Sequence, residues 1–118
     1  MNDCIFCKII NKEIPSNIVY EDADFLAFLD ITPRAPGHTQ IIPKKHYRWV
    51  WDVPNTSAYF EVAKKIALAQ RKAFNVEMIR SQIYGEAVPH AHIWVWPEIE
   101  GDATDLKGNL EKLRNNII

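Results

Sequence analysis

The chain has 118 residues, of which 47% are hydrophobic and 25% are charged, and its formal net charge is −1. This length fits one domain with one core, and the composition is typical of a soluble globular protein. The near-neutral charge gives no electrostatic basis for binding DNA, RNA or an anionic membrane. No apolar run approaches the ~20 residues of a membrane span, and the N-terminus lacks a signal-peptide pattern. We therefore expect a single domain over residues 1–118 in the cytoplasm.

The N-terminal third predicts one short helix followed by strands. Apolar residues at near-helical spacing indicate a helix over residues 4–11. Two short strands are expected at residues 17–21 and 25–29, joined by a turn rich in Asp. Residues 30–38 contain Pro and Gly and should form a loop, and residues 39–42 should form a short buried strand.

A long helix is expected in the middle of the chain. Either Thr56 or Ser57 can cap its start, and it should run to about Phe74. It carries one apolar stripe, made of Tyr59, Val62, Ala63, Ile66, Ala67 and Phe74. The aromatic segment before it, residues 47–51, shows no clear preference for helix or strand.

The C-terminal part predicts two strands and a final helix. The strands are expected at residues 78–84 and 90–96, and the helix at residues 104–115, where Gly108 weakens it. The element order is then α-β-β-β-α-β-β-α. Short neighbouring strands joined by tight turns favour an α+β fold, with an antiparallel sheet and helices alongside.

The last expected strand lies between Pro89 and Pro97, and along it small apolar residues alternate strictly with histidine or tryptophan. Alternate side chains of a strand point to opposite faces, so its small apolar residues form a face suited to a core. The other face carries larger polar and aromatic side chains, each ~6.6 Å from the next. These residues are His90, His92, Trp94 and Trp96. Such a face is typical of a binding or catalytic surface.

The stretch Pro-His-Ala-His-Ile-Trp-Val-Trp-Pro resembles the signature strand of the histidine triad (HIT) nucleotide-binding proteins, His-φ-His-φ-His-φ-φ with φ apolar. Trp94 stands in the place of the third histidine. Residues 30–38 also resemble the family's Asp-Ile-x-Pro-x-Ala-Pro-x-His, and Pro-Lys-Lys-His follows as in the family. The resemblance covers most of the chain. It implies a HIT-like antiparallel sheet of about five strands with flanking helices, and a homodimer.

A metal site is expected around the two cysteines. Cys4-x-x-Cys7 offers two soft ligands on one turn, and zinc takes four N or S ligands, with His46 and His90 as candidates to complete the set. The HIT-related hexose-1-phosphate uridylyltransferases bind structural zinc through matching positions, so the resemblance implies a structural zinc here. Two buried cysteines without metal are the alternative. A redox role is less favoured because the motif opens the chain instead of following a strand.

The resemblance assigns His92 as the middle histidine, which attacks the α-phosphorus of a nucleotide and forms a nucleotidyl-histidine intermediate. This chemistry needs a neutral imidazole whose other nitrogen is held by an acceptor, so that one lone pair faces phosphorus. A near-neutral pKa makes histidine usable both as nucleophile and as leaving group at pH 7. The alternative is a strand histidine that is only hydrogen-bonded.

The resemblance also implies a nucleotide pocket, and hence a purine nucleotide or nucleotide conjugate as ligand. Phe6, Ile9 and Ile14 match the apolar residues that sandwich the base. Asp30 matches the carboxylate that accepts hydrogen bonds from the ribose hydroxyls, and Ile31 lies beside it. Without the family, the apolar residues are core and Asp30 is a turn carboxylate.

The phosphate end of the motif departs from the family in three ways. The indole of Trp94 can donate one hydrogen bond but cannot transfer its proton. A reaction that needs general acid catalysis is then expected to lose ~10²–10⁴-fold in rate. Glu86 and Ala87 stand in Gly-Glu-Ala-Val, where the family typically has Gly-Gln-Ser-Val. The loop before Gly85 is shorter than usual, and an asparagine common there has no counterpart. The uridylyltransferases carry glutamine at the Trp94 position and still transfer nucleotides.

The four tryptophans have two interpretations. Trp49, Trp51, Trp94 and Trp96 fit a core or a subunit interface better than a ligand-stacking surface. Trp94 is the exception, because the motif places it at the phosphate site.

Taken together, the motifs predict a HIT-type nucleotidyl hydrolase or transferase that acts on the α-phosphate of a nucleoside monophosphate ester or phosphoramidate through His92. One alternative is a non-catalytic nucleotide-binding relative. The other is a zinc-stabilised protein-interaction module.

Overall fold

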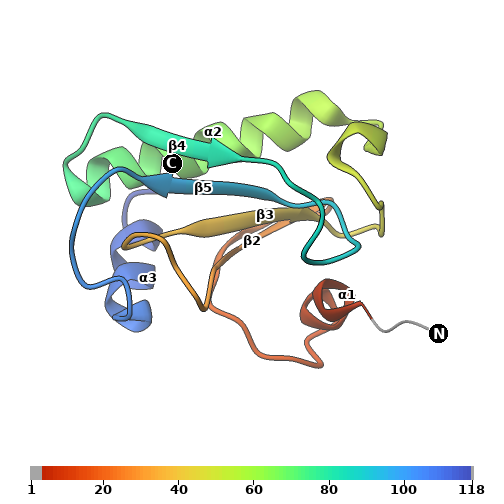
Figure 1. The fold of residues 1–118 in the computed structure, drawn as a ribbon, viewed down its shortest axis with the longest axis horizontal. Helices are drawn as coiled ribbons and strands as arrows, with labels where there is room; N and C mark the ends of the chain where they lie inside the picture. Colours follow the sequence, from red (N-terminus) through yellow and green to blue (C-terminus); the bar gives the residue numbers. More distant parts are fainter. Residues whose placement is uncertain (1–3, 118) are drawn as a thin grey trace.

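The computed structural model describes residues 4–117, in which five antiparallel strands form one sheet with helices on both faces (Figure 1). The strands are β1 (Ile18–Glu21), β2 (Phe25–Leu29), β3 (Thr39–Pro43), β4 (Ile79–Gln82) and β5 (Ile93–Pro97), in the order β1-β2-β3-β5-β4. The helices are α1 (Ile5–Ile10), α2 (Thr56–Phe74) and α3 (Leu106–Arg114), with a short 3-10 turn η1 (Val50–Asp52). The expected α+β fold is confirmed.

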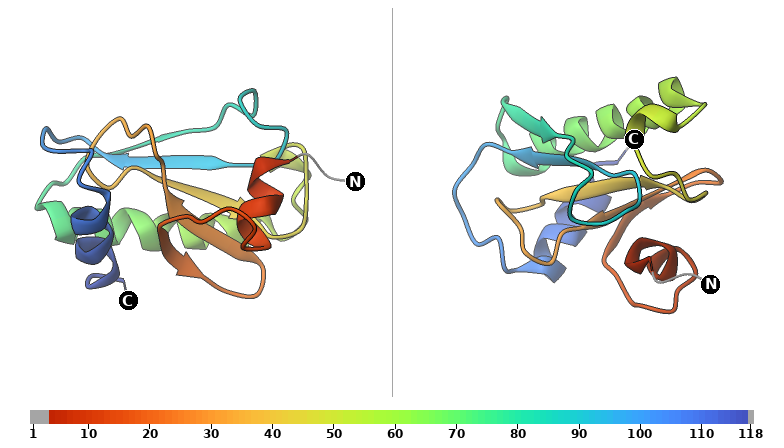
Figure 2. Two further views of the ribbon diagram at one scale, coloured as in Figure 1. Left: turned by 90° about the horizontal axis from the view of Figure 1, so that it is seen from below. Right: turned by 45° about the vertical axis from the view of Figure 1, so that its right-hand side comes forward.

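Both faces of the sheet are covered at its centre, which explains the uninterrupted burial of β2. Alternate residues of β2 point to opposite faces. Phe25, Ala27 and Leu29 pack in the cluster that includes α2 and α3, and Leu26 and Phe28 pack in the cluster that includes α1. In Figure 1, α1 lies below the sheet and α2 above it, and the right-hand view of Figure 2 shows the same separation.

Helix α2 is fixed to the sheet by its apolar stripe and by two polar contacts. Tyr59 stacks on Phe25 with ring centroids 4.9 Å apart, and its hydroxyl donates to the carbonyl of Ile41 at 2.8 Å. Gln70 is fully buried, and its amide nitrogen donates to the carbonyls of Gly37 and Val95. These contacts offset the desolvation cost of burying the Tyr59 hydroxyl and the Gln70 amide nitrogen, while the side-chain oxygen of Gln70 has no partner among the described residues.

The N-terminal boundary of α2 differs from the prediction. Asn55 occupies the N-cap position, not Thr56 or Ser57, and its side chain makes no capping hydrogen bond. Thr56 instead donates its hydroxyl to the carbonyl of Val53 at 2.6 Å. At the other end, Asn75 has a left-handed conformation and ends the helix after Phe74 as predicted.

The final strand is shorter than predicted, because β5 begins at Ile93 and not at His90. The last pair it forms with β3 joins Ile93 to Ile41. Just before that point, the amide of Ala91 donates to the carbonyl of Tyr47 at 2.7 Å. Residues 90–92 are therefore held by the segment that follows β3, outside the sheet ladder.

Smaller differences occur at other ends. β4 is limited to Ile79–Gln82, and β3 extends to Pro43. α3 begins at Leu106, where the Asp105 side chain caps the helix by accepting from the amide of Gly108 at 3.1 Å. Within residues 4–117, the structure has no helix with the length and apolarity required to cross a membrane.

Candidate functional site

A row of side chains crosses the α1-facing side of the sheet at the candidate site. The strand register aligns Phe28 of β2 with Gln40 of β3, Gln40 with Trp94 of β5, and Trp94 with Gln82 of β4. The apolar cluster of α1 includes Phe28 at one end of the row. The row therefore changes from apolar to polar and aromatic as it leaves the helix.

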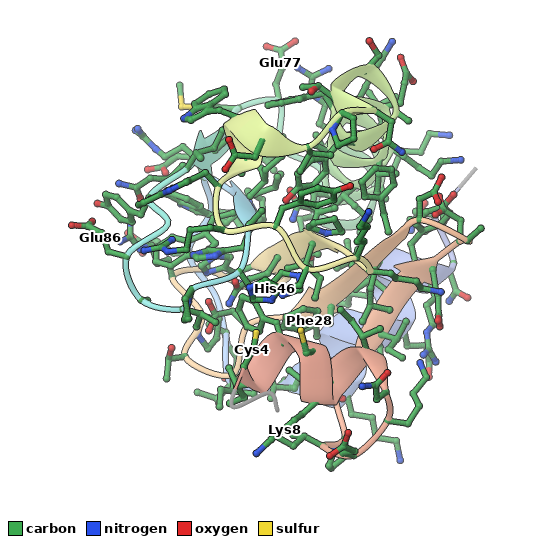
Figure 3. The ribbon with its side chains drawn as sticks, turned by 90° about the vertical axis from the view of Figure 1, so that its right-hand side faces the viewer. Cys4, Lys8, Phe28, His46, Glu77 and Glu86 are labelled. Carbon is green, nitrogen blue, oxygen red and sulfur yellow. The ribbon has the colours of Figure 1, made fainter. Side chains whose placement is uncertain are left out.

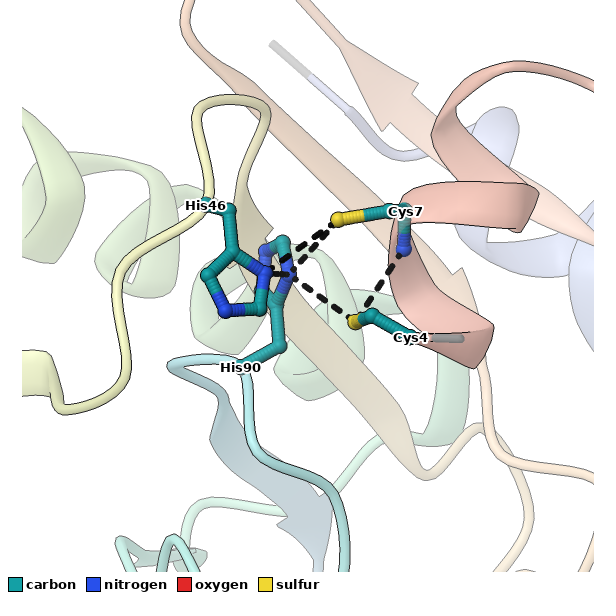
Figure 4. A group of neighbouring side chains, drawn as sticks. All are labelled: Cys4, Cys7, His46 and His90. Atoms are coloured by element: carbon teal, nitrogen blue, oxygen red, sulfur yellow. Dashed lines mark hydrogen bonds between the residues drawn. The ribbon is translucent and has the colours of Figure 1, made fainter. Parts of the chain in front are cut away.

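The candidate metal ligands come from three separate parts of the chain and meet beside α1. Cys4 and Cys7 lie at the start of α1, His46 follows β3, and His90 precedes β5. Cys4 and His46 are labelled in Figure 3. Their four ligand atoms all lie within 4.8 Å of one another. The structure thus brings together all four residues that the sequence predicted (Figure 4).

Several distances between these atoms are close to those around a tetrahedral zinc ion, although the widest separation in the set reaches 4.8 Å. The Cys7 sulfur lies 3.3 Å from Nδ1 of His46 and 3.5 Å from Nδ1 of His90, and the Cys4 sulfur lies 3.4 Å from Nδ1 of His90. The two Nδ1 atoms are 3.1 Å apart. Zinc bonds of about 2.0 Å to nitrogen and 2.3 Å to sulfur place tetrahedral ligand atoms roughly 3.3–3.8 Å apart.

The surroundings of His90 favour the form that binds metal. Its Nε2 lies 2.8 Å from the carbonyl of Pro43, which accepts a hydrogen bond from the protonated Nε2 and leaves Nδ1 deprotonated toward the cysteines. Burial lowers the pKa of His90 to about 4, so the ring is neutral at pH 7. A neutral imidazole is the ligand form that zinc requires.

His92 is held in the tautomer that a nucleophile needs. Its ring is only 1% exposed, and Nδ1 lies 2.7 Å from the carbonyl of His90, to which it donates. Nε2 then carries no proton, and its lone pair is available as a nucleophile. Burial lowers the pKa of His92 and the charge of Arg48 lowers it further, while the His90 carbonyl and Asp30 raise it. The net effect favours neutral imidazole at pH 7.

The residues predicted to hold the base lie next to His92, with one exception. Phe6 meets the edge of His92 with ring centroids 5.4 Å apart, and it packs in one cluster with Ile9 and Ile14. Phe6 and Ile9 are buried, and Ile14 is half-buried. Ile31, by contrast, is 78% exposed and does not belong to this cluster.

Asp30 is buried and already makes several hydrogen bonds. Its Oδ1 accepts from the backbone amide of Thr32 at 2.8 Å and from the Thr32 hydroxyl at 3.0 Å, and its Oδ2 accepts from the amide nitrogen of Gln40 at 3.1 Å. A carboxylate has about four lone-pair sites, so one remains for a ligand hydroxyl. Asp30 thus retains the capacity that a ribose contact would use.

Trp94 stands at the end of the site away from α1. Its ring centroid lies 6.2 Å from that of His92 and 5.5 Å from that of His38. The guanidinium of Arg34 lies 4.9 Å from the Trp94 ring centroid, and Tyr84 meets the same ring edge-on. The indole nitrogen of Trp94 is buried and has no hydrogen-bond partner among the described residues.

Arg48 is a cation beside His92 that sequence reasoning did not single out. It donates to the carbonyl of Gly85 at 2.5 Å, and its guanidinium lies 3.7 Å from the ring centroid of Trp49. Gly85 has φ +88°, and a Cβ there would meet Trp49 at 2.6 Å. Only glycine fits this approach. The exposed Glu86 follows at the outer edge of the molecule (Figure 3).

Sequence reasoning also assigned no role to Arg34, His38 or Gln40. His38 accepts a hydrogen bond from the amide of Arg34 at Nδ1, 3.1 Å away, and burial lowers its pKa to about 4. Gln40 alternates with Ile41 and thus shares the α1-facing side with Trp94, a position that its strand pattern indicates. No local signal places Arg34 over Trp94, because that contact depends on the course of the loop over residues 30–38.

The comparison with known proteins decides the family. The HIT domain family model matches residues 11–101. This chain belongs to the HIT domain family. A solved structure of a Hit-like protein from Bartonella henselae is 39% identical, with a TM-score of 0.89 over 99% of this chain and 98% of that chain. These findings confirm the resemblance and the fold.

Two further HIT proteins bear on the site. A zinc-bound histidine triad family protein from Mycobacterium smegmatis is 32% identical, with a TM-score of 0.86 over 97% of this chain and 92% of that chain. Adenosine 5'-monophosphoramidase of Saccharomyces cerevisiae is 41% identical over 99 residues, which are 80% of this chain and 62% of the relative. Zinc is therefore known in a member of the family with the same fold.

Proposed function

We propose that this HIT protein is a nucleotidyl hydrolase or transferase that acts on the α-phosphate of a nucleoside monophosphate ester or phosphoramidate. The observation that carries the proposal is the state of His92, a buried neutral imidazole whose Nδ1–H is fixed on the His90 carbonyl. Its Nε2 lone pair is the nucleophile. The related yeast protein is named an adenosine 5'-monophosphoramidase, which supports the same reaction class.

The reaction has two steps that both pass through His92. Nε2 attacks the α-phosphorus, a P–N bond forms, and the bond to the leaving group breaks with its electron pair on that group. Water or another acceptor then attacks phosphorus and gives up its proton to solvent, while the P–N electron pair returns to Nε2. The carbonyl of His90 stabilises the positive charge on the ring between the steps.

The remaining predicted residues bind the nucleotide. Phe6, Ile9 and Ile14 enclose a purine base, and Asp30 accepts from the ribose with Ile31 beside it. The support is the contact of Phe6 with His92 and the remaining acceptor site on Asp30.

We further propose that zinc on Cys4, Cys7, His46 and His90 has a structural role. The support is the set of ligand distances, together with the origin of the ligands from three parts of the chain. The ion then fixes His90, whose carbonyl orients His92. We also propose a homodimeric cytoplasmic protein of one domain, with the exposed Trp51, Phe60 and Met78 as apolar surface for the second copy. Sedimentation at micromolar concentration tests the dimer.

A substrate with a visible leaving group tests the proposed reaction. The zinc-loaded protein should release 4-nitrophenolate from the 4-nitrophenyl ester of AMP, and His92→Ala should lower the rate at least about 10³-fold, because no other group replaces the nucleophile. AMP affinity, measured by calorimetry, should persist in the variant. Lys8→Ala, at an α1 position outside the metal ligands, is the control and should keep the rate.

Two outcomes would contradict the proposal. AMP binding without release by the wild-type protein would indicate a non-catalytic nucleotide-binding relative, which Trp94 and Ala87 at the phosphate end favour. Absence of both release and binding would favour a zinc-stabilised interaction module.

A further inference from the structure

Trp94 occupies the side of the proposed site from which the leaving group departs. It stands in the place of the third histidine and cannot act as a proton donor there. Trp94 aligns with Gln40 and Gln82 on the neighbouring strands and lies 6.2 Å from His92 by ring centroids. Its indole N–H donates one hydrogen bond but supplies no proton near pH 7. A poor leaving group, such as an amine or an alkoxide, needs such a proton in order to depart.

Arg34 covers this same position with a fixed positive charge. Its guanidinium lies 4.9 Å from the ring centroid of Trp94 and 5.1 Å from that of Trp96. Its NH1 donates to the side-chain oxygen of Gln82 at 2.7 Å, which fixes the orientation of the planar group. Arg34 has no carboxylate partner among the described residues, so its remaining N–H groups are available to an anion.

Two hollows in the surface are lined in part by Arg34. One hollow of about 400 Å³ is lined by Arg34, Ala35, Trp96, Pro97, Glu98, Ile99 and Glu100, so it carries acidic side chains as well as the arginine. Another of about 290 Å³ is lined by Arg34, Arg80, Ser81, Gln82 and Trp96. The second is flanked by two arginines, of which Arg80 pairs with Glu98. Because Arg34 lies over Trp94, a group that extended along β5 from His92 past Trp94 would reach an exposed guanidinium.

The groups near Trp94 offer little acid help. His38 is neutral at pH 7, and its Nδ1 is occupied by the amide of Arg34. Both oxygens of Asp30 already accept hydrogen bonds, Oδ1 from the amide of Thr32 and Oδ2 from the side chain of Gln40. Among residues 4–117, Tyr84 is the remaining titratable side chain in ring contact with Trp94, and the variant Tyr84→Phe tests it as a proton donor.

We propose that Arg34, stacked on Trp94 and Trp96, binds the leaving group, and that the site selects nucleotides whose leaving group departs as an anion without taking up a proton. The substrate class is the nucleoside phosphoanhydride, with sulfate, phosphate or carboxylate as the departing group. Phosphoramidates and alkyl esters are poor substrates. This inference rests on the proposed function, because it keeps the attack of His92 on the α-phosphorus, but it replaces the esters and phosphoramidates named there with anhydrides as the preferred substrates.

The first step balances without an acid. As Nε2 of His92 bonds to the α-phosphorus, the P–O bond to the departing oxyanion breaks and its electron pair stays on that oxygen. Arg34 neutralises the developing charge by hydrogen bonds and by its positive charge, and it gives up no proton.

The experiment measures single-turnover rates for AMP joined to four groups: sulfate, phosphate, 4-nitrophenol and an alkyl amine. The wild-type protein should cleave the sulfate and phosphate anhydrides at least about 10²-fold faster than the amide, because the amide needs a proton. Trp94→His should raise the amide rate by ~10²–10⁴-fold, since it restores a titratable donor. Zinc content and melting temperature show that this variant is folded.

The role of Arg34 is tested with a matched pair of charge deletions. Arg34→Gln should slow the anhydrides by about 10–10²-fold and leave the 4-nitrophenyl ester within a few-fold, because that leaving group is uncharged before it departs. Arg71→Gln removes an arginine on α2 and should change neither rate. Arg34 is exposed, so its replacement leaves the core intact.

Several results would overturn the inference. Equal wild-type rates for the amide and the anhydrides would show that a proton donor is present. A lower rate for the amide alone in Tyr84→Phe would identify Tyr84 as that donor. Unchanged anhydride rates in Arg34→Gln would remove Arg34 from the leaving-group site. Cleavage of none of the four compounds, with AMP still bound, would contradict the proposed function itself and this inference with it.

Discussion

At the scale of single residues, backbone carbonyls determine what the histidines can do. His90 donates from Nε2 to Pro43, so its Nδ1 faces the cysteines, and His92 donates from Nδ1 to His90, so its Nε2 keeps a lone pair. Two histidines that are separated by one residue thus present opposite nitrogens. The sequence identifies both residues, but it cannot specify the tautomers, because the acceptors depend on the folded path of the chain.

His38 makes the stability of the protein depend on pH. Burial holds its pKa at about 4 in the folded protein, below the ordinary 6.5, with Asp30 opposing the shift and Arg34 adding to it. The unfolded chain takes up the proton first, so stability should fall as pH decreases from about 6.5 to about 4. The loss from this group is at most roughly 3 kcal/mol.

Urea denaturation of the wild-type protein and His38→Asn between pH 4 and 7 measures this effect. Asparagine does not titrate, and its oxygen can still accept from the amide of Arg34. The variant should therefore show a weaker pH dependence over this interval. An identical dependence in both proteins would show that His38 is not the group responsible.

At the scale of elements, the four proposed metal ligands would fix the short α1 against the sheet once they hold zinc. A six-residue helix is marginal by itself, and α1 contributes only Phe6, Cys7 and Ile9 as buried residues. Its first turn carries both cysteines, while His46 and His90 extend from the ends of two strands. Zinc would thus hold the base-binding side of the site in contact with His92.

Removal of zinc should destabilise this arrangement. The purified protein should contain one zinc per chain, and chelation should lower the melting temperature by roughly 10 °C or more, because the ligand set is lost with the ion. Cys7→Ala should reproduce this shift, while the neighbouring Lys8→Ala should not. A protein that contains no zinc after expression with zinc, or that melts unchanged after chelation, would contradict the structural role.

The elements also show where sequence patterns succeed and where they fail. The 3.6-residue period predicted α2, because its stripe with Tyr59 and Ile66 is buried against the sheet. Alternation predicted the core face of β5 but extended the strand to His90, since a pattern cannot reveal that the Ala91 amide bonds to Tyr47. The metal ligands were predictable through the family's spaced motifs. The position of Arg34 over Trp94 was not, because it follows from the fold of a loop.

At the scale of the whole molecule, the sheet arranges the proposed reaction from one edge to the other. The α1 side carries the proposed zinc ligands and the apolar residues proposed to bind the base, and His92 lies next to them. Beyond His92, the row continues through Trp94 on β5 to Gln82 on β4. There the guanidinium of Arg34 donates a hydrogen bond to the side-chain oxygen of Gln82. A nucleotide bound along this row as proposed would have its base at α1, its α-phosphorus at His92 and its leaving group at Arg34.

The central claim of this account is covalent catalysis by His92. Intact mass spectrometry of the zinc-loaded protein, quenched in alkali within one turnover of the adenylyl sulfate anhydride, tests it most directly. The account predicts a mass increase of one adenylyl group in the wild-type protein, its absence in His92→Ala, and a phosphoramidate linkage that acid releases. Release of sulfate with no adduct at any quench time, or an equal adduct in His92→Ala, would contradict it.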